Sequence, residues 1–135
     1  MGQFRDEAIL LDFGEGGYGS TILIDTQSLK SLTSLLEIFT RLALGSLMTV
    51  DLSSFEGVFR SRTIDSFDLI RDAGKSVLEV IATSEQRFSI RWTDSPGNWQ
   101  HRADLIMALR DGRLPGHQDL TEEGDGVLVV LQFQE

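Results

Sequence analysis

The sequence holds two histidines, and each has an aspartate within three residues of it. His117 and Asp119 could form an acid–base pair, in which the carboxylate orients the imidazole. Nucleophilic catalysis would also need an activated serine, and no serine of the chain stands in a G-x-S-x-G elbow. His101 and Asp104 could supply two metal ligands from one helix face, but a zinc site needs three or four protein ligands. We therefore expect neither a catalytic residue nor a metal site.

A glycine-rich stretch, GEGGYG at residues 14–19, matches the dinucleotide-binding pattern G-x-G-x-x-G letter for letter. That pattern binds a pyrophosphate when a helix follows it directly, and here the strand-like STILIDT follows. The stretch also looks like the nucleotide loop of protein kinases, but the next strand offers no lysine and the chain has no H-R-D triplet. We predict a hairpin turn with positive φ angles, no cofactor, and partner contacts from Glu15 and Tyr18.

Trp92 and Trp99 flank the polar stretch TDSPGN and could form a stacking platform for a sugar. Trp92 stands in a strand-like stretch and Trp99 in a helix-like one, which favours a place in the core for both. Paired carboxylates for glycoside hydrolysis are assembled only by the fold, and 21 acidic residues will include some close pair in any case. These residues therefore favour no class of enzyme.

Acidic residues are concentrated near the end of the sequence. From Asp119 onward there are five acids and no basic residue, whereas residues 86–113 hold five arginines against three aspartates. A loop of this charge, held at both ends by a helix and a strand, could present carboxylates to a cationic surface at modest entropic cost. The alternative is a solvated connection. The candidate partner contacts in this segment are His117, Asp119, Glu122, Glu123 and Asp125.

The whole chain is acidic, with 12 basic residues, 21 acidic residues and a formal charge of −9. This charge disfavours nucleic acid and anionic membranes as partners, because neutralising phosphates requires Lys and Arg. It favours a basic protein partner through electrostatic steering, although solubility alone also accounts for an acidic surface. The chain has no cysteine, no secretory signal at its start and no apolar run of about 18 residues. We expect a cytoplasmic protein that does not enter membranes.

Alternating or continuous apolar stretches predict strands over residues 8–13, 20–26, 47–52, 76–84, 86–94 and 126–134. The fourth and fifth stretches follow each other closely and are expected to form a hairpin with one face in water. The last stretch is apolar at every position from Val127 to Leu131, which predicts an interior strand covered on both faces. Within residues 53–75, FEGVFRSR fits an extended piece, and DSFDLIRDAG fits a short helix or a loop.

A first helix is predicted over residues 27–44, capped by Asp25 or Thr26 and ended by Gly45. Its apolar side chains recur at spacings of three and four, as one face of a helix requires. The predicted core face consists of Leu29, Leu32, Leu36, Phe39 and Ala43.

A second helix is predicted over residues 95–112. Ser95 as N-cap, Pro96 as the first helical residue and Gly112 after the end follow the usual asymmetry of helix termini. The predicted core face consists of Trp99, Ala103, Ile106 and Leu109.

This order of elements predicts the α+β class, with a mainly antiparallel sheet of about five to six strands and two helices packed on it. A chain of 135 residues fits a single domain that spans residues 1–135. The sequence leaves the oligomeric state open.

The small size, the acidity, the absence of cysteine and the α+β order resemble immunity proteins of bacterial toxin systems. The segment PGHQDL, the acids after it and the final stretch VLVVLQFQE are similar to C-terminal segments of such proteins. The resemblance covers the C-terminal part of the chain and assigns a role to no residue. It implies a protein that binds a cognate toxin and blocks it without catalysing a reaction.

The leading hypothesis is therefore a protein, not an enzyme, that neutralises a basic toxin domain such as a nuclease. It would occlude the active or substrate-binding surface of the toxin with carboxylates that pair with Lys and Arg. Two alternatives are a small ligand-binding or hydrolytic domain that uses His117 and a structural subunit of a larger assembly.

Overall fold

The computed structural model describes residues 9–16, 19–55, 58–60, 62–112, 116–121 and 127–133. This part of the chain contains two α-helices and two mixed β-sheets. The elements in chain order are β1 (Ile9–Gly16), β2 (Gly19–Thr26), α1 (Leu29–Leu44), β3 (Thr49–Asp51), a 3-10 turn (Leu52–Ser54), β4 (Val58–Arg60), β5 (Ile64–Arg71), β6 (Val77–Ser84), β7 (Arg87–Asp94), α2 (Pro96–Arg110), β8 (His117–Asp119) and β9 (Val127–Phe133).

Sheet A has the strand order β4-β1-β2-β9-β8. β1 and β2 form the antiparallel hairpin that the glycine-rich stretch predicts. β9 pairs in parallel with β2 and antiparallel with β8, so it lies in the interior of the sheet, as predicted. Val129 and Leu131 are fully buried, whereas Leu128 and Val130 are half-buried on the opposite face. One face of β9 is therefore fully buried and the other is half-buried, which corrects the prediction that both faces are covered.

Sheet B has the order β3-β5-β7-β6, in which β6 and β7 form the predicted hairpin. β5 corrects the interpretation of DSFDLIRDAG as a short helix or a loop, because it pairs with β3 on one side and β7 on the other. Phe67 and Leu69 are buried, and Asp68 and Ile70 lie on the other face of the strand. The sequence does not show a regular alternation of polar and apolar residues, because the outer face of β5 carries both a carboxylate and an aliphatic side chain.

The α+β class and the two helices are confirmed, but the expectation of one mainly antiparallel sheet is wrong. Among the described strands, three pairs are parallel: β1 with β4, β2 with β9, and β5 with β7. Parallel neighbours cannot be joined by a tight turn, so each pair brings together strands that are separated in the sequence. Hydrophobic periodicity is a local property of the chain and carries no information about such pairs.

Helix α1 begins at Leu29 and is capped by Ser28, not by Asp25 or Thr26. The side chain of Ser28 accepts from the backbone N–H of Ser31, and the side chain of Ser31 accepts from the N–H of Ser28. This reciprocal capping box satisfies two helix-terminal donors, which explains why the helix starts there.

Gly45 ends α1 in the left-handed region with φ 88°, as predicted. At the other end, Leu29 is 48% exposed in the first turn, which corrects its place in the predicted core face. Of the other predicted members, Leu32, Leu36 and Phe39 are buried, and Ala43 is partly buried against the core.

Helix α2 begins and packs as predicted. The side chain of Ser95 accepts from the N–H of Asn98, and Pro96 is the first helical residue. All four side chains of the predicted face are buried: Trp99, Ala103, Ile106 and Leu109.

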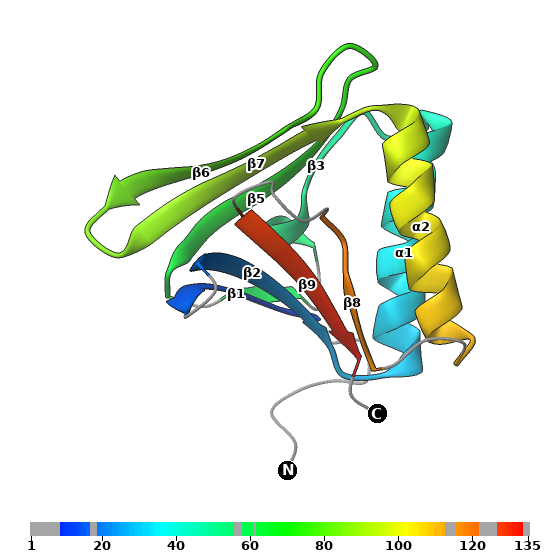
Figure 1. Cartoon of the computed structure of the whole chain (residues 1–135), viewed down its shortest axis with the longest axis horizontal. Helices are drawn as coiled ribbons and strands as arrows, with labels where there is room; N and C mark the ends of the chain where they lie inside the picture. Colours follow the sequence, from blue (N-terminus) through cyan, green and yellow to red (C-terminus); the bar gives the residue numbers. More distant parts are fainter. Residues whose placement is uncertain are drawn as a thin grey trace.

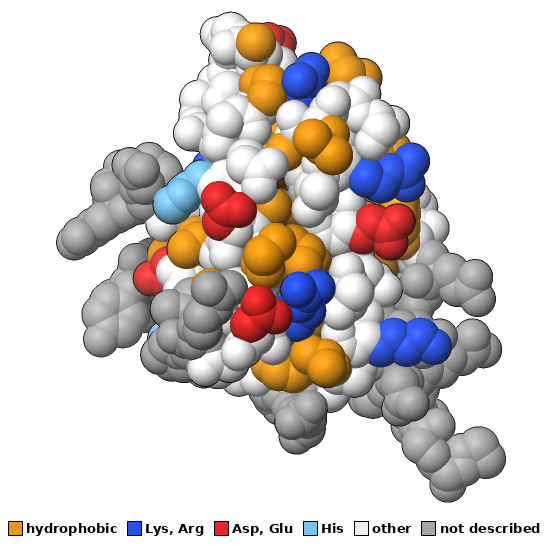
Figure 2. Space-filling view, turned by 90° about the vertical axis from the view of Figure 1, so that its right-hand side faces the viewer, with side chains coloured by type: hydrophobic (Ala, Val, Ile, Leu, Met, Phe, Trp, Pro, Cys, Tyr) orange, Lys and Arg blue, Asp and Glu red, His pale blue; other side chains and the backbone are white. Residues whose placement is uncertain are grey.

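Figure 1 shows α1 and α2 side by side along one side of the molecule, with sheets A and B on the other side. β8 runs between β9 and α2, which places the edge of sheet A next to a helix. Seen from the helices, the surface carries hydrophobic side chains in several separate groups among charged ones (Figure 2). Within the described residues, neither helix is long and apolar enough to cross a membrane.

Candidate binding sites

One buried carboxylate holds the junction of β7 and α2. Oδ1 of Asp94 accepts from the backbone N–H of Ser95 at 2.8 Å and from Nδ2 of Asn98 at 2.7 Å. Burial would raise the pKa of Asp94, but these hydrogen bonds and the neighbouring Arg102 guanidinium together hold that pKa below its ordinary value of 3.8. Asp94 is therefore ionised at neutral pH.

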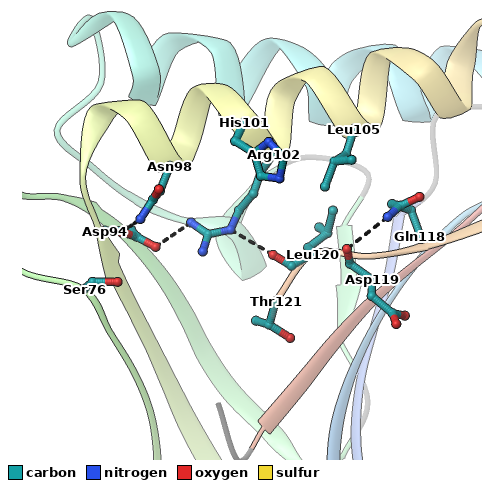
Figure 3. Close-up of a pocket in the computed structure, with 10 residues that line it drawn as sticks. All are labelled: Ser76, Asp94, Asn98, His101, Arg102, Leu105, Gln118, Asp119, Leu120 and Thr121. Carbon is teal, nitrogen blue, oxygen red and sulfur yellow. Dashed lines mark hydrogen bonds and ion pairs between the residues drawn. The ribbon is translucent and has the colours of Figure 1, made fainter. Parts of the chain in front are cut away.

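The Arg102 guanidinium lies against this carboxylate and is itself buried, with 9% of the residue exposed. Nη1 lies 2.7 Å from Oδ2 of Asp94 in an ion pair, and it has no hydrogen bond in the described part of the chain. Nε donates to the carbonyl oxygen of Leu120 at 3.0 Å. Nη2 has no partner in the described part of the chain, and it points into the space between Ser76 and Thr121 (Figure 3). Its two N–H groups therefore remain for another acceptor.

Trp92 and Trp99 form the wall against which Arg102 packs. Cζ of Arg102 lies 4.3 Å from the ring centroid of Trp92 and 5.1 Å from that of Trp99, at cation–π distances. Nε1 of Trp99 donates to the carbonyl oxygen of Ile70 at 3.1 Å. Both tryptophans are almost fully buried, so they belong to the core, as predicted, and do not form a sugar platform.

A pocket of about 410 Å³ opens between α2 and β8 (Figure 3). Its polar lining includes Ser76, Asn98, His101, Arg102, Gln118 and Thr121. A second pocket of about 220 Å³ shares Ser76, Asp94, Arg102 and Thr121 with the first and adds an apolar wall of Val77, Leu78 and Trp92. Both pockets combine polar and apolar side chains and meet at Arg102, and we call them together the two-lobed pocket.

The carboxylate of Asp119 points away from Arg102, although the residue borders the larger lobe (Figure 3). Successive side chains of a strand point to opposite faces, so Asp119 lies on the outer face of sheet A. The register places Asp119 opposite Val130, Val130 opposite Leu23, and Leu23 opposite Asp12. We call these four residues the acid-flanked row: its two ends are exposed aspartates and its two central residues are half-buried and apolar.

The next row on the same face contains Asp25 and His117. Burial raises the pKa of Asp25, and a hydrogen bond with Gln27 offsets part of the rise. His117 is exposed and does not line the two-lobed pocket. In the described residues no hydrogen bond or ion pair joins His117 to Asp119, so the structure does not assemble the acid–base pair considered from the sequence.

The other partner contacts expected from the sequence cannot be placed. Tyr18, Glu122, Glu123 and Asp125 lie outside the described residues. The backbone of Glu15 belongs to β1 and pairs with Ser20, but its side chain is not described. Of the predicted set, Asp119 and His117 are thus the two whose side chains the structure places, and both lie on the outer face of sheet A.

His101 and Asp104 do not gather further ligands. His101 is exposed on α2 at the border of the larger lobe, and Asp104 accepts from Nε2 of Gln100 at 3.0 Å. Among the described residues, no group of three or more His, Cys, Asp or Glu side chains is arranged to hold a metal ion.

Sequence reasoning missed the cluster of Asp94, Asn98 and Arg102. These three residues are spaced by four along the sequence. Asn98 and Arg102 therefore lie on one face of α2, next to Asp94, which precedes the N-cap Ser95. This spacing could have been read from the sequence, because Ser95 and Pro96 already predict where α2 starts. A polar residue at every fourth position on a helix usually indicates a solvated face, and here Asn98 is exposed but Arg102 is buried.

Comparison of the chain with protein-family models, with curated proteins and with solved structures gave no match.

Proposed function

We propose that this chain is a binding protein, not an enzyme, that neutralises a cationic protein by covering it with the outer face of sheet A. The acid-flanked row carries the proposal: Asp12 and Asp119 are exposed at its ends, and Leu23 and Val130 are half-buried between them. Protein interfaces combine a desolvated centre with a polar rim that selects the partner. An acidic rim fits a partner whose rim carries Lys and Arg.

The two aspartates have carboxylate oxygens available for such a partner. Asp119 is exposed, and its carboxylate has no partner in the described part of the chain. Oδ1 of Asp12 accepts from the N–H of Phe13 at 2.9 Å, while Oδ2 has no partner among the described residues. A cationic side chain can therefore approach either residue without breaking an internal ion pair, which keeps the cost of binding low.

The formal charge of −9 supports the same class of partner, because it attracts a basic protein at long range and accelerates association. The partner class that we propose is a basic bacterial toxin domain such as a nuclease. A nuclease binds phosphates with a cationic surface, and the aspartates of the row occupy the places that phosphates would take. Inhibition follows from occlusion and needs no chemistry from the chain.

The test coexpresses the whole chain with basic toxin domains encoded beside its gene and measures cell growth. Asp12→Asn and Asp119→Asn are combined in one variant. The matched control combines Glu37→Gln with Glu85→Gln, which removes the same charge from exposed positions on α1 and in the β6–β7 turn. We expect the wild type and the control to protect against one such toxin and the Asp12/Asp119 variant to bind it at least about tenfold more weakly.

Two results would contradict the proposal. If the wild-type chain protects cells against none of the neighbouring toxins, the function is wrong. If the Asp12/Asp119 variant binds as tightly as the control, the partner uses another surface.

A further inference from the structure

We propose that the two-lobed pocket binds a small uncharged molecule in which a carbonyl group stands next to an aromatic or short apolar part. The carbonyl oxygen accepts from Nη2 of Arg102, and the apolar part lies in the smaller lobe against Val77, Leu78 and Trp92. Asp119 borders the larger lobe and also belongs to the acid-flanked row, but Arg102, Val77, Leu78 and Trp92 are not part of that row, so this proposal does not depend on the proposed function.

The donors of Arg102 indicate what the ligand must supply. Nε is committed to the carbonyl oxygen of Leu120, and Nη1 faces the carboxylate of Asp94. Nη2 has two N–H groups and no acceptor in the described part of the chain. Nη1 is the buried nitrogen of Arg102 that has no hydrogen bond in the described part of the chain, whereas Nη2 points into the pocket and can donate to an acceptor that enters from outside the chain.

The charges around Arg102 favour an uncharged acceptor. Asp94 already compensates the guanidinium at 2.7 Å, and it is buried in the same place. The chain as a whole carries a formal charge of −9. A carboxylate ligand would bring a second negative charge to a compensated site and would lose its own hydration there. A neutral carbonyl oxygen meets the same N–H groups without that penalty.

The size and mixed walls of the pocket fit a small molecule that has both a polar group and an apolar part. The larger lobe, at about 410 Å³, lies within the range of known ligand pockets, roughly 300–1,000 Å³. Both lobes have mixed walls: Leu105 and Leu120 line the larger lobe among polar residues, and Val77, Leu78 and Trp92 line the smaller lobe beside Ser76 and Thr121. Benzamide has the required chemistry, because its carbonyl group adjoins an aromatic ring. Benzoate has nearly the same shape and differs in charge.

The experiment titrates the whole chain with benzamide and, separately, with benzoate at pH 7. The NMR signals followed are those of the Nε–H of Arg102 and the indole N–H of Trp92. We expect benzamide to shift both signals in a saturable way, and benzoate to bind at least about tenfold more weakly because of its charge.

The variants separate the pocket from the rest of the surface. Ser76→Phe fills the junction of the lobes, because Ser76 lines both, and Ser76 is exposed, so the fold is expected to persist. Ser84→Phe is the matched control, since Ser84 is an exposed serine that lines neither lobe. Ser76→Phe should weaken benzamide binding at least about tenfold, whereas Ser84→Phe should leave it unchanged. Melting curves of both variants report the fold directly.

Three outcomes would overturn the proposal. Benzamide could give no saturable shift at Arg102 in the wild type. Benzoate could bind as tightly as benzamide, which would make the pocket an anion site. Ser76→Phe could bind benzamide as the control does, which would place the binding elsewhere. None of these outcomes changes the expected result of the growth test, so the two proposals fail separately.

Discussion

Asp12 and Asp119 stand at opposite ends of one row across sheet A, with Leu23 and Val130 between them. Neighbouring strands lie about 4.8 Å apart, so three strand spacings separate the two aspartates by roughly 14 Å. The Debye length at physiological salt is about 8 Å, so the two carboxylates repel each other weakly. They can both face one partner without opposing each other in the free protein.

Replacing Asp12 and Asp119 with Asn should leave the melting temperature within about 2 °C of the wild type, because exposed carboxylates contribute little to stability. Association with the toxin should slow several-fold at low salt, and the difference should shrink as salt is raised. The measurement is association kinetics at two salt concentrations. The Glu37→Gln/Glu85→Gln control should show a smaller change; equal slowing would mean that net charge alone steers association.

Val129→Asp should destabilise the fold by at least about 3 kcal/mol, because Val129 is fully buried in the interior strand β9 and the new charge would have no partner. Val130→Asp is the matched control, since Val130 is the next residue and is half-buried on the outer face. It should cost much less. Denaturant unfolding of both variants measures the difference, and equal losses would contradict the assignment of inner and outer faces.

Asp94→Asn should cost about 3–5 kcal/mol, because it leaves the buried Arg102 guanidinium without a compensating charge. Asp65→Asn is the comparison: Asp65 pairs with Arg87, whose side chain is 45% exposed, and an exposed pair contributes less than about 1 kcal/mol. Urea unfolding reports both values. A loss at Asp94 as small as that at Asp65 would show that the ion pair at α2 is solvated.

The stability of the wild type should depend on Asp94 at acid pH. Because its pKa is lowered in the folded state, Asp94 contributes stability that is fully present above about 3.8 and is lost as the pH falls through the lower folded pKa. Asp25 and Asp68 have pKa values raised by burial and act in the opposite direction, since they cost stability once they ionise. The difference in unfolding free energy between wild type and Asp94→Asn isolates Asp94, and it should decrease below pH 3.8. A difference that stays constant down to pH 2 would exclude this role.

The elements with local signals could be predicted from the sequence. Helix α2 has a serine cap, a proline at its first position and four apolar residues on one face, and all of them lie where expected. The interior position of β9 followed from its continuous apolar run. Caps and periodicity act within a few residues, so a single sequence displays them.

The division into two sheets could not be predicted, because parallel pairs such as β5 with β7 depend on contacts that no local pattern encodes. The same limit applies to the sites. Asp119 was found from its charge, but Leu23, Val130 and Asp12 join it only through strand register. Arg102 was missed because its position along α2 does not reveal that its side chain is buried.

The parallel pairing of β2 with β9 also determines when the fold can be completed. The hydroxyl of Thr26 donates to the carbonyl oxygen of Gln132, across 106 residues of sequence. Until β9 is synthesised, β2 presents an open edge and β8 has no neighbour in the sheet. Pairing over such separations carries a large loop-closure cost, so we expect folding in about milliseconds to seconds and not microseconds. A ribosome-bound chain that lacks β9 would expose the edge of β2 to other chains, which makes this the stage at which a chaperone is most needed.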